Sequence, residues 1–342
     1  MSEVLLRAGG RSVRFRRRTG VVLVLTLVAV VVLGVVGLML GDYDISAREV
    51  LAALSGGGDD PVATYFVTEL RLPRVVTAIV VGAALGISGS LFQNVTGNPL
   101  GSPDIIGFTT GAATGALVQI IVLGGDSDAV AVGAVVGGIG TAVLVHLLTR
   151  PHGLTGQRLV LVGIGVGATL AAVNTLLVVR ASLVAAQTAA QWLAGSLSAV
   201  LWPRATVVTV AIAVLTLAAL LLARPLQLLA LGDDTARAVG VPAQRVRTAA
   251  VAVGVGLVSV ATATTGPIAF VALAAPQVSR RLAGSPTPGV AGPAATGAAL
   301  VLGADLIGQH LLAPTQLAVG VVTGALGGVY LIGLLALEWR RR

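Results

Sequence analysis

The sequence predicts an all-α, polytopic membrane protein with about ten transmembrane helices. Hydrophobic residues make up 56% of its 342 residues, whereas charged residues make up only 11%. Uncharged runs of about twenty residues, the length of a membrane-crossing helix, recur from one end of the chain to the other. A water-soluble domain of this size is excluded, because it would need a far more polar surface.

A basic segment, residues 1–19, precedes the first apolar run and is expected to lie in the cytoplasm. The run itself, residues 20–40, is too long for the core of a secretory signal, and no small-residue cleavage site follows it. We therefore interpret it as a membrane anchor and expect residues 20–342 to form a single transmembrane domain. The further spans are predicted at residues 72–93, 107–125, 129–149, 159–180, 205–223, 247–265, 267–280, 290–310 and 317–338.

The distribution of arginine predicts the orientation of these spans. All 22 basic residues are arginines, and they lie in short clusters between apolar runs, which is typical of membrane topology and not of nucleic-acid binding. Because cytoplasmic loops carry most basic residues, we expect both termini in the cytoplasm and the chain in the inner or plasma membrane. In this orientation the arginines on the outer side are Arg48, Arg71, Arg74, Arg180 and Arg204.

Missing residues exclude several enzyme classes. The chain has no lysine, so it lacks the phosphate-binding loop of an ordinary P-loop ATPase, and it has no cysteine for disulfides or thiolate chemistry. Neither the H-E-x-x-H motif of metalloproteases nor the G-x-S-x-G motif of serine hydrolases occurs. We predict no catalytic residue, no metal ligand and no cofactor.

The 45 glycines predict how the helices pack. Small residues four apart allow two membrane helices to bring their backbones close together. This spacing occurs in GAALG (82–86), GAATG (111–115) and GVVTG (320–324). The spacing is common in membrane helices, so it predicts packing and says nothing about function.

Two interruptions of the apolar pattern are candidates for the lining or gate of a pathway. The stretch GNPLGSPDIIG after the second span contains Pro99 and Pro103, which prevent a continuous helix. The span at 267–280 is only about 21 Å long as a helix, against a hydrocarbon core of about 30 Å. Broken backbone at membrane depth is tolerated only where protein or a water-filled cavity covers it. The candidate gate residues are Asn98, Pro99 and Pro276.

Few ionisable residues lie inside the predicted spans. Asp305 is the main one, with His146 and His310 close to span ends. Because proton-coupled carriers usually need several buried carboxylates or histidines, we expect Asp305 to make a structural hydrogen bond to a neighbouring helix. An ion-coupled secondary transporter remains the alternative function, and a structural membrane scaffold is a third.

The longest polar insertion on the predicted inner side, residues 224–247, is typical of two short helices joined by a glycine. Asp233 and Asp234 suit a helix N-terminus, Gly240 suits a helix end, and Pro242 suits the first turn of a second helix. We interpret the insertion as a docking element for a cytoplasmic protein; the alternative is a surface connector without a partner. Its candidate coupling residues are Gly232, Asp233, Asp234, Arg237 and Gly240.

Five sequence blocks occur in an order typical of one transporter family. They are RLPRVVTAIVVGAALGISGSLFQNVTGNPLGSPDIIGFTTGA (71–112), QWLAGSLS (191–198), LLALGDDTARAVGV (228–241), GPIAFVALAAPQVSR (266–280) and LAVGVVTGALGG (317–328). Together they resemble the permease subunits of binding-protein-dependent ABC importers of the iron-siderophore and vitamin B12 class, the FecCD type. The chain departs from that pattern at Gln277 and Ala318, where the family usually has histidine and proline. It also departs at Gln309 and His310, near which the family often has an arginine that would make a third docking contact.

The resemblance implies the type II ABC importer permease fold and a set of partners. The chain would pair with a second copy or a close homologue, and its outer helices would contact membrane lipid. Two ATPase subunits would dock on residues 224–247, and an extracytoplasmic substrate-binding protein would dock outside. The expected cargo is an iron(III)-siderophore, with cobalamin or haem as alternatives. The fifth and tenth spans would line the pathway, where Gly167, Asn174 and Gly324 are the candidate residues.

Arg71 and Arg74 are the candidate docking residues for the binding protein. Pro73 predicts that a helix starts here, which would place both charges near the positive end of a helix dipole. The resemblance implies that these arginines meet acidic residues of the binding protein. The alternative is interfacial anchoring of the helix, with local partners among Glu69, Asp59 and Asp60.

Overall fold

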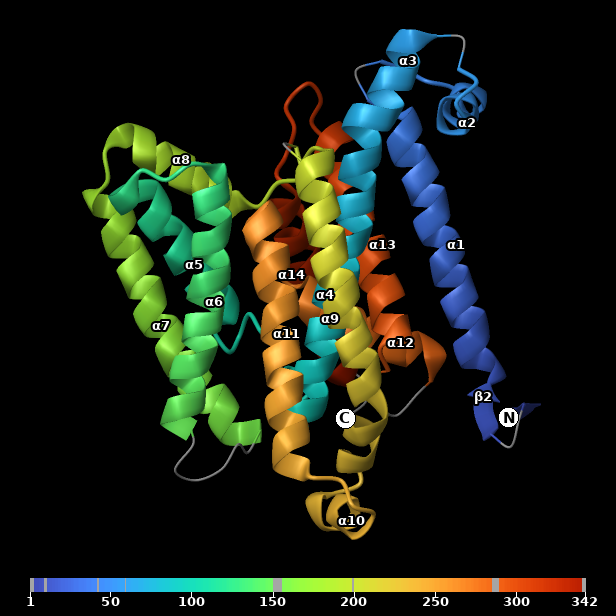
Figure 1. Ribbon diagram of the computed structural model, residues 1–342, viewed down its shortest axis with the longest axis vertical. Helices are drawn as coiled ribbons and strands as arrows, with labels where there is room; N and C mark the ends of the chain where they lie inside the picture. Colours follow the sequence, from blue (N-terminus) through green and yellow to red (C-terminus); the bar gives the residue numbers. More distant parts are fainter. Residues whose placement is uncertain are drawn as a thin grey trace.

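A computed structural model describes residues 3–8, 11–41, 43–58, 60–149, 156–198, 200–284 and 289–339. They form a bundle of long helices with short helices at its two ends (Figure 1). We call the end with α2 (Ala47–Ser55), α3 (Pro61–Tyr65) and α8 (Leu183–Ala194) the upper end, and the end with α10 (Asp233–Ala238) the lower end. At the N-terminus β1 (Glu3–Ala8) and β2 (Arg11–Arg16) pair as an antiparallel hairpin.

Within the described residues, 7 helices are long and apolar enough to cross a membrane. They contain α1 (Arg17–Met39), α4 (Leu72–Thr96), α6 (Ser127–Thr149), α7 (Gly156–Arg180), α9 (Trp202–Leu229), α11 (Ala243–Thr265) and α13 (Ala291–His310). The shorter apolar helices are Phe108–Leu123, which joins α5 (Phe108–Leu117) to its π-helical extension η2 (Val118–Leu123), and Val319–Gly333 within α14 (Val319–Trp339). A further short helix is α12 (Val271–Ala283). Each predicted span coincides with one of these helices, so the all-α membrane fold is confirmed, and the number ten holds approximately.

The second predicted span begins where α4 begins, at Leu72, but the helix itself starts earlier. The helix runs without a break from Pro61 to Thr96, through the π-helical turn η1 (Phe66–Arg71) into α4. Pro73 has no N–H and its ring would clash with the carbonyl four residues earlier in a regular helix, and the wider turn accommodates it. Asp60 caps the true N-terminus by accepting the Val62 N–H at 2.8 Å. Arg71 and Arg74 therefore lie inside a long helix and not at its positive end.

The glycine motif 82–86 brings α4 against α13, as its spacing predicts. A Cβ atom at Gly82 would overlap the Gly297 backbone, and one at Gly86 would overlap the Pro293 carbonyl. Gly297 meets α4 in the same way, because its Cβ would overlap the Gly82 carbonyl. The two helices touch backbone to backbone, so only glycine fits at these positions.

The second motif joins α5 to α6. A side chain at Gly115 would overlap the Gly133 carbonyl, and one at Gly137 would overlap the Gly111 carbonyl. The third motif is used only in part. Gly320 packs against the carbonyls of Ala194 and Pro267, whereas Gly324 faces open space.

We predict that Gly137→Leu will separate α5 from α6 and lower stability by about 1–3 kcal/mol, because an added side chain in a packed contact forces the backbones apart. Gly140→Leu, one turn along the same helix, is the matched control, since a Cβ there meets nothing within 4 Å. The unfolding temperature of the two purified variants is the measurement. Equal unfolding temperatures would contradict the packing role of the motif.

Candidate functional site

Arg71 at the upper end binds the C-terminus of α1. Its Nη1 donates to the carbonyls of Leu38 and Met39, each at 2.9 Å, and its Nη2 donates to the Tyr43 carbonyl at 2.6 Å. The last carbonyls of a helix have no partner within the helix and carry partial negative charge. The guanidinium therefore lies at the negative end of the α1 dipole, which is the favourable end for a cation.

Arg74 makes a two-pronged salt bridge to Asp305 on α13. Its Nε and Nη2 donate to the two carboxylate oxygens, each at 2.9 Å, and Gln309 donates a third hydrogen bond to the same carboxylate at 2.8 Å. The side chain of Asp305 is 6% exposed and that of Arg74 is 18% exposed. The expectation of a structural bond from Asp305 to a neighbouring helix is confirmed, and its partner is one of the two candidate docking arginines.

Of the local partners expected for these arginines, Asp60 has other contacts, because it accepts from the Tyr43 hydroxyl at 3.1 Å and caps α3. Among the described residues Arg74 pairs with Asp305 and not with Glu69. Asp59 lies outside the described residues. His310 forms a hydrogen bond with the Leu306 carbonyl of its own helix at 2.9 Å. Gln309, the other residue that departs from the family pattern here, contacts the carboxylate that pairs with Arg74.

We predict that Arg74→Met or Asp305→Leu alone will lower the free energy of unfolding by about 3 kcal/mol, because each leaves a buried charge unpaired. The double variant should lose no more than the worse single variant, because the two residues form one unit. The matched control is Arg204→Met, whose partner Asp128 is 91% exposed and whose loss should cost under about 1 kcal/mol. Additive losses from Arg74→Met and Asp305→Leu would show that the two side chains act independently.

The broken segment between α4 and α5 is clamped to the short helix α12. Gln277 donates from Nε2 to the Pro99 carbonyl at 2.8 Å, and Gln93 donates to the Leu273 carbonyl at 3.1 Å. Pro276 lies in the buried face of α12, and Asn98 accepts from the Leu100 N–H at 2.9 Å within the turn. The two interruptions that the sequence marks as gate candidates are therefore in contact with each other.

Asp104 is the ionisable residue of this contact that the sequence reasoning missed. Its Oδ1 accepts from the Thr109 hydroxyl at 2.6 Å, and the backbone of Phe270, at the start of α12, interacts with the same carboxylate. Oδ2 is nevertheless buried without a hydrogen bond of normal geometry within the described residues. Phe270 has a positive φ of 68°, which is unusual for a bulky residue. An acid directly after the second of two prolines, in an otherwise uncharged stretch, is the signal that could have identified it.

The pathway candidates on α7 and α14 have different environments. Gly167 lies against Gly107, where a Cβ would come within 3.0 Å of the backbone, so this glycine serves close packing. Gly324 is open, with no atom within 4 Å of an added Cβ. Asn174 donates a long hydrogen bond of 3.4 Å to the Thr110 carbonyl, and its Oδ1 is buried without a partner in the described chain.

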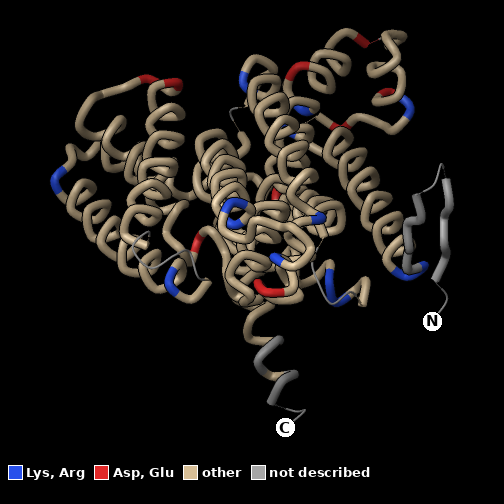
Figure 2. The backbone as a smooth tube through the Cα atoms, turned by 60° about the horizontal axis from the view of Figure 1, so that its bottom comes forward, with Lys and Arg blue, Asp and Glu red and all other residues tan. Residues whose placement is uncertain are grey.

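The polar insertion at the lower end forms α10 between two glycines with positive φ, Gly232 at 106° and Gly240 at 82°. The predicted glycine punctuation is confirmed, but the second helix is not short, because residues from Ala243 onward belong to the long helix α11. Pro242 is its cap residue. Basic residues gather on several helix ends around α10 (Figure 2).

Asp233 fastens α10 to α11. Two nitrogens of Arg247 donate to its carboxylate at 2.8 and 2.6 Å, and this hydrogen bonding holds the pKa of Asp233 below its ordinary value. Asp234 is fully exposed and lies 3.7 Å from Arg237, which is a loose surface contact. Of the two acids at the start of α10, Asp233 thus fixes this helix to α11, whereas Asp234 makes only the loose contact.

We predict that Asp233→Asn will raise the hydrogen-exchange rate of the α10 amides, because it weakens the contact with Arg247. Asp234→Asn is the matched control and should leave these rates unchanged. Because the pKa of Asp233 is lowered in the folded chain, its contribution is complete above the ordinary carboxyl pKa of about 4 and is lost as the pH falls through the lower folded value. Exchange rates that respond equally to both substitutions would contradict the assignment.

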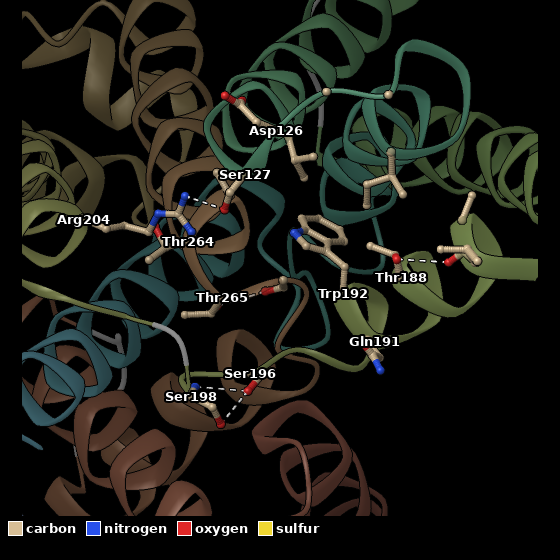
Figure 3. A pocket seen from close by; sticks show the side chains of 18 of the residues that line it. Asp126, Ser127, Thr188, Gln191, Trp192, Ser196, Ser198, Arg204, Thr264 and Thr265 are labelled. Atoms are coloured by element: carbon tan, nitrogen blue, oxygen red, sulfur yellow. Dashed lines mark hydrogen bonds between the residues drawn. The ribbon is translucent and has the colours of Figure 1, made fainter. Parts of the chain in front are cut away.

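The upper end also holds a cavity of about 640 Å³ between α6, α8, α9 and α11. Its wall is rich in hydroxyl groups and contains Trp192 and Arg204 (Figure 3). Arg204 donates from Nη2 to the Ser127 hydroxyl at 2.7 Å, which links α9 to the start of α6. Asp126 is used as the cap of α6, where it accepts from the Ala129 N–H at 2.9 Å.

Comparisons with known proteins all match transport proteins. The pattern of the FecCD transport family matches residues 27–337. The ferric enterobactin transport system permease protein FepG of Escherichia coli (strain K12) is 47% identical over 326 residues, which cover 95% of this chain and 98% of that protein. The achromobactin transport system permease protein CbrC of Dickeya dadantii (strain 3937) is 37% identical and covers 98% of this chain and 97% of its own.

The vitamin B12 import system permease protein BtuC of Escherichia coli O6:H1 is 33% identical, covering 82% of this chain and 87% of its own. Among solved structures, a metal-chelate type ABC transporter in an inward-facing conformation superposes with a TM-score of 0.82 at 28% identity. That match covers 93% of this chain and 99% of the other.

Proposed function

The chain belongs to the FecCD transport family, and from that membership we propose that this permease subunit of an ABC importer carries an iron(III)-siderophore into the cytoplasm. The observation that carries the proposal is the 47% identity, along nearly the whole length of both chains, with a ferric enterobactin permease. The vitamin B12 permease is more distant, at 33%, so cobalamin is the second candidate cargo. An ion-coupled carrier is not favoured, because the acid inside α13 is already paired with Arg74.

The proposed assembly has the upper end outside and the lower end in the cytoplasm. A second permease, identical or homologous, would pair with this one along α7 and α14, and the cargo would pass between the two. The face of α14 at Gly324 supports this arrangement, because a Cβ added at Gly324 or Gly328 meets nothing within 4 Å. Two cytoplasmic ATPase subunits would dock on α10 and supply the energy, since this chain has no lysine for a phosphate-binding loop of its own.

A substrate-binding protein would deliver the cargo at the upper end, and we propose that Arg71 and Arg74 take part in its docking. Both guanidinium groups already hold parts of this chain together, Arg71 at the end of α1 and Arg74 at Asp305. The binding protein would therefore meet guanidinium groups that are already held in place, and docking would not need to order free side chains. Fixed charges of this kind steer association and select partners more than they add affinity.

The function is tested by reconstituting the chain with its second permease, the ATPase and the binding protein in vesicles. We expect ATP-dependent uptake of a labelled ferric siderophore in excess of labelled cobalamin. Preferred uptake of cobalamin would overturn the cargo, and uptake driven by an ion gradient without ATPase would overturn the class.

Gly240→Pro should abolish this uptake and the co-purification of the ATPase, because proline cannot adopt the φ of 82° and removes the N–H that Gly240 donates to the Arg237 carbonyl at 2.9 Å. Gly56→Pro does the same damage at the upper end of the bundle, where Gly56 has a φ of 76° and donates to the Ala53 carbonyl. We expect the ATPase still to co-purify with the Gly56→Pro control. Loss of the ATPase from both variants would indicate general misfolding.

The docking proposal is separated from the structural role by exchanging the charges, Arg74→Asp with Asp305→Arg. The exchange keeps an ion pair between α4 and α13 but moves the positive charge to the other helix. We expect near-normal stability with association of the binding protein slowed several-fold at low salt and less at high salt. Unchanged association would restrict Arg74 to its structural role.

A further inference from the structure

An amphipathic groove runs down the outside of the bundle between α6 and α9, with α11 as its floor. It has a volume of about 780 Å³. Valine is the most frequent residue in its walls, and Val132, Val136 and Val207 are 61%, 63% and 69% exposed. The groove adjoins the hydroxyl-rich cavity in Figure 3, and the two share a common wall of Ser127, Arg204, Ala263 and Thr264.

The groove is polar at the top and apolar below. Its polar side chains, Ser127, Asp128, Arg204 and Thr264, all lie toward the upper end, beside Leu201 and Pro203, and the side chains farther down are apolar as far as Val136 on α6 and Ala211 on α9. From Leu201 to Ala211 the groove wall is about 15 Å long, at about 1.5 Å per helical residue. Half of a hydrocarbon core of about 30 Å has the same depth. The groove thus matches one leaflet of a bilayer in both length and polarity.

The charged end of the groove has unused donors and an unused acceptor. Arg204 donates only from Nη2, to Ser127 and to Asp128 Oδ1 at 2.9 Å, so its Nε and Nη1 have no partner among the described residues. Asp128 is 91% exposed and uses only one of its carboxylate oxygens. A guanidinium with two free N–H groups suits a phosphate. The adjacent carboxylate would repel a purely anionic headgroup and would accept a hydrogen bond from an ammonium group.

We infer that the groove binds one phospholipid with a primary-amine headgroup from the leaflet at the upper end. The phosphate lies on Arg204, the ammonium group lies on Asp128, and one acyl chain fills the valine-lined part. In the orientation proposed above this is the outer leaflet. A second copy of the chain is the less suitable occupant, because neither α7 nor α14, the proposed pairing helices, contributes a residue to the groove.

The site is tested on the full chain, delipidated in mild detergent and then given equal amounts of phosphatidylethanolamine, phosphatidylglycerol and phosphatidylcholine with the same acyl chains. Native mass spectrometry counts the retained lipids. We expect phosphatidylethanolamine to be retained about two- to fivefold over phosphatidylcholine, whose quaternary amine has no proton to donate to Asp128. Asp128→Asn should remove this preference, and Arg204→Gln should lower retention of all three lipids. Arg180→Gln, at another upper-end arginine, is the charge control.

Val207→Trp should fill the groove and remove the retained lipid, whereas Val214→Trp, on the same helix and 64% exposed but outside the groove, should not. Equal retention by these two variants, or no headgroup preference in the wild-type chain, would overturn the proposal. Loss of a protein dimer in Val207→Trp without loss of lipid would assign the groove to a second copy instead. None of these outcomes depends on the cargo or on the ATPase, so the lipid site and the transport function are tested separately.

Discussion

The fold depends on backbone contact between α4 and α13. Lipid tails are as apolar as the helices, so helices in a membrane associate through close packing and polar contacts and gain little from hydrophobic burial. Gly82, Gly86 and Gly297 provide the packing, and the Arg74–Asp305 salt bridge fixes the register at the upper end. A substitution at any of these positions would affect every helix that packs on the pair.

The other helices of the centre are attached to α4 by polar bonds to backbone. Ser88 donates to the Gly254 carbonyl of α11 at 2.7 Å, and Gln93 donates to the Leu273 carbonyl of α12. The broken segment joins the same unit through Gln277, which donates to the Pro99 carbonyl, and through Asp104, whose carboxylate interacts with the Phe270 backbone. By contrast, α7 keeps most of its surface exposed, and Gly324 of α14 has no neighbour. We therefore regard α4, α13 and α12 as the rigid frame and the α7 and α14 faces as the places where transport changes the structure.

The sequence alone was sufficient to predict features whose pattern is local in the chain. Apolar runs marked the helices, two of the three glycine motifs marked close helix contacts in full and the third marked one in part, and Gly240 marked the end of α10. It was insufficient where partners are far apart in the chain. Arg74 and Asp305 are 231 residues apart, and no local pattern shows that they meet. Pro73 was read as a helix start because the π-helical turn before it leaves no composition signal.

The rigid frame can be measured directly, because a chain without cysteine accepts spin labels only where cysteines are introduced. Labels at the exposed residues Leu70, in η1 just before α4, and Ile307 on α13 report the distance between the two helices by pulsed electron resonance. We predict the same distance in the resting and the ATP-bound importer, while a pair at Leu70 and Val321 of α14 changes. A shift in the distance between Leu70 and Ile307 would contradict the account, because the contact on which the fold is built would then be one of the moving parts.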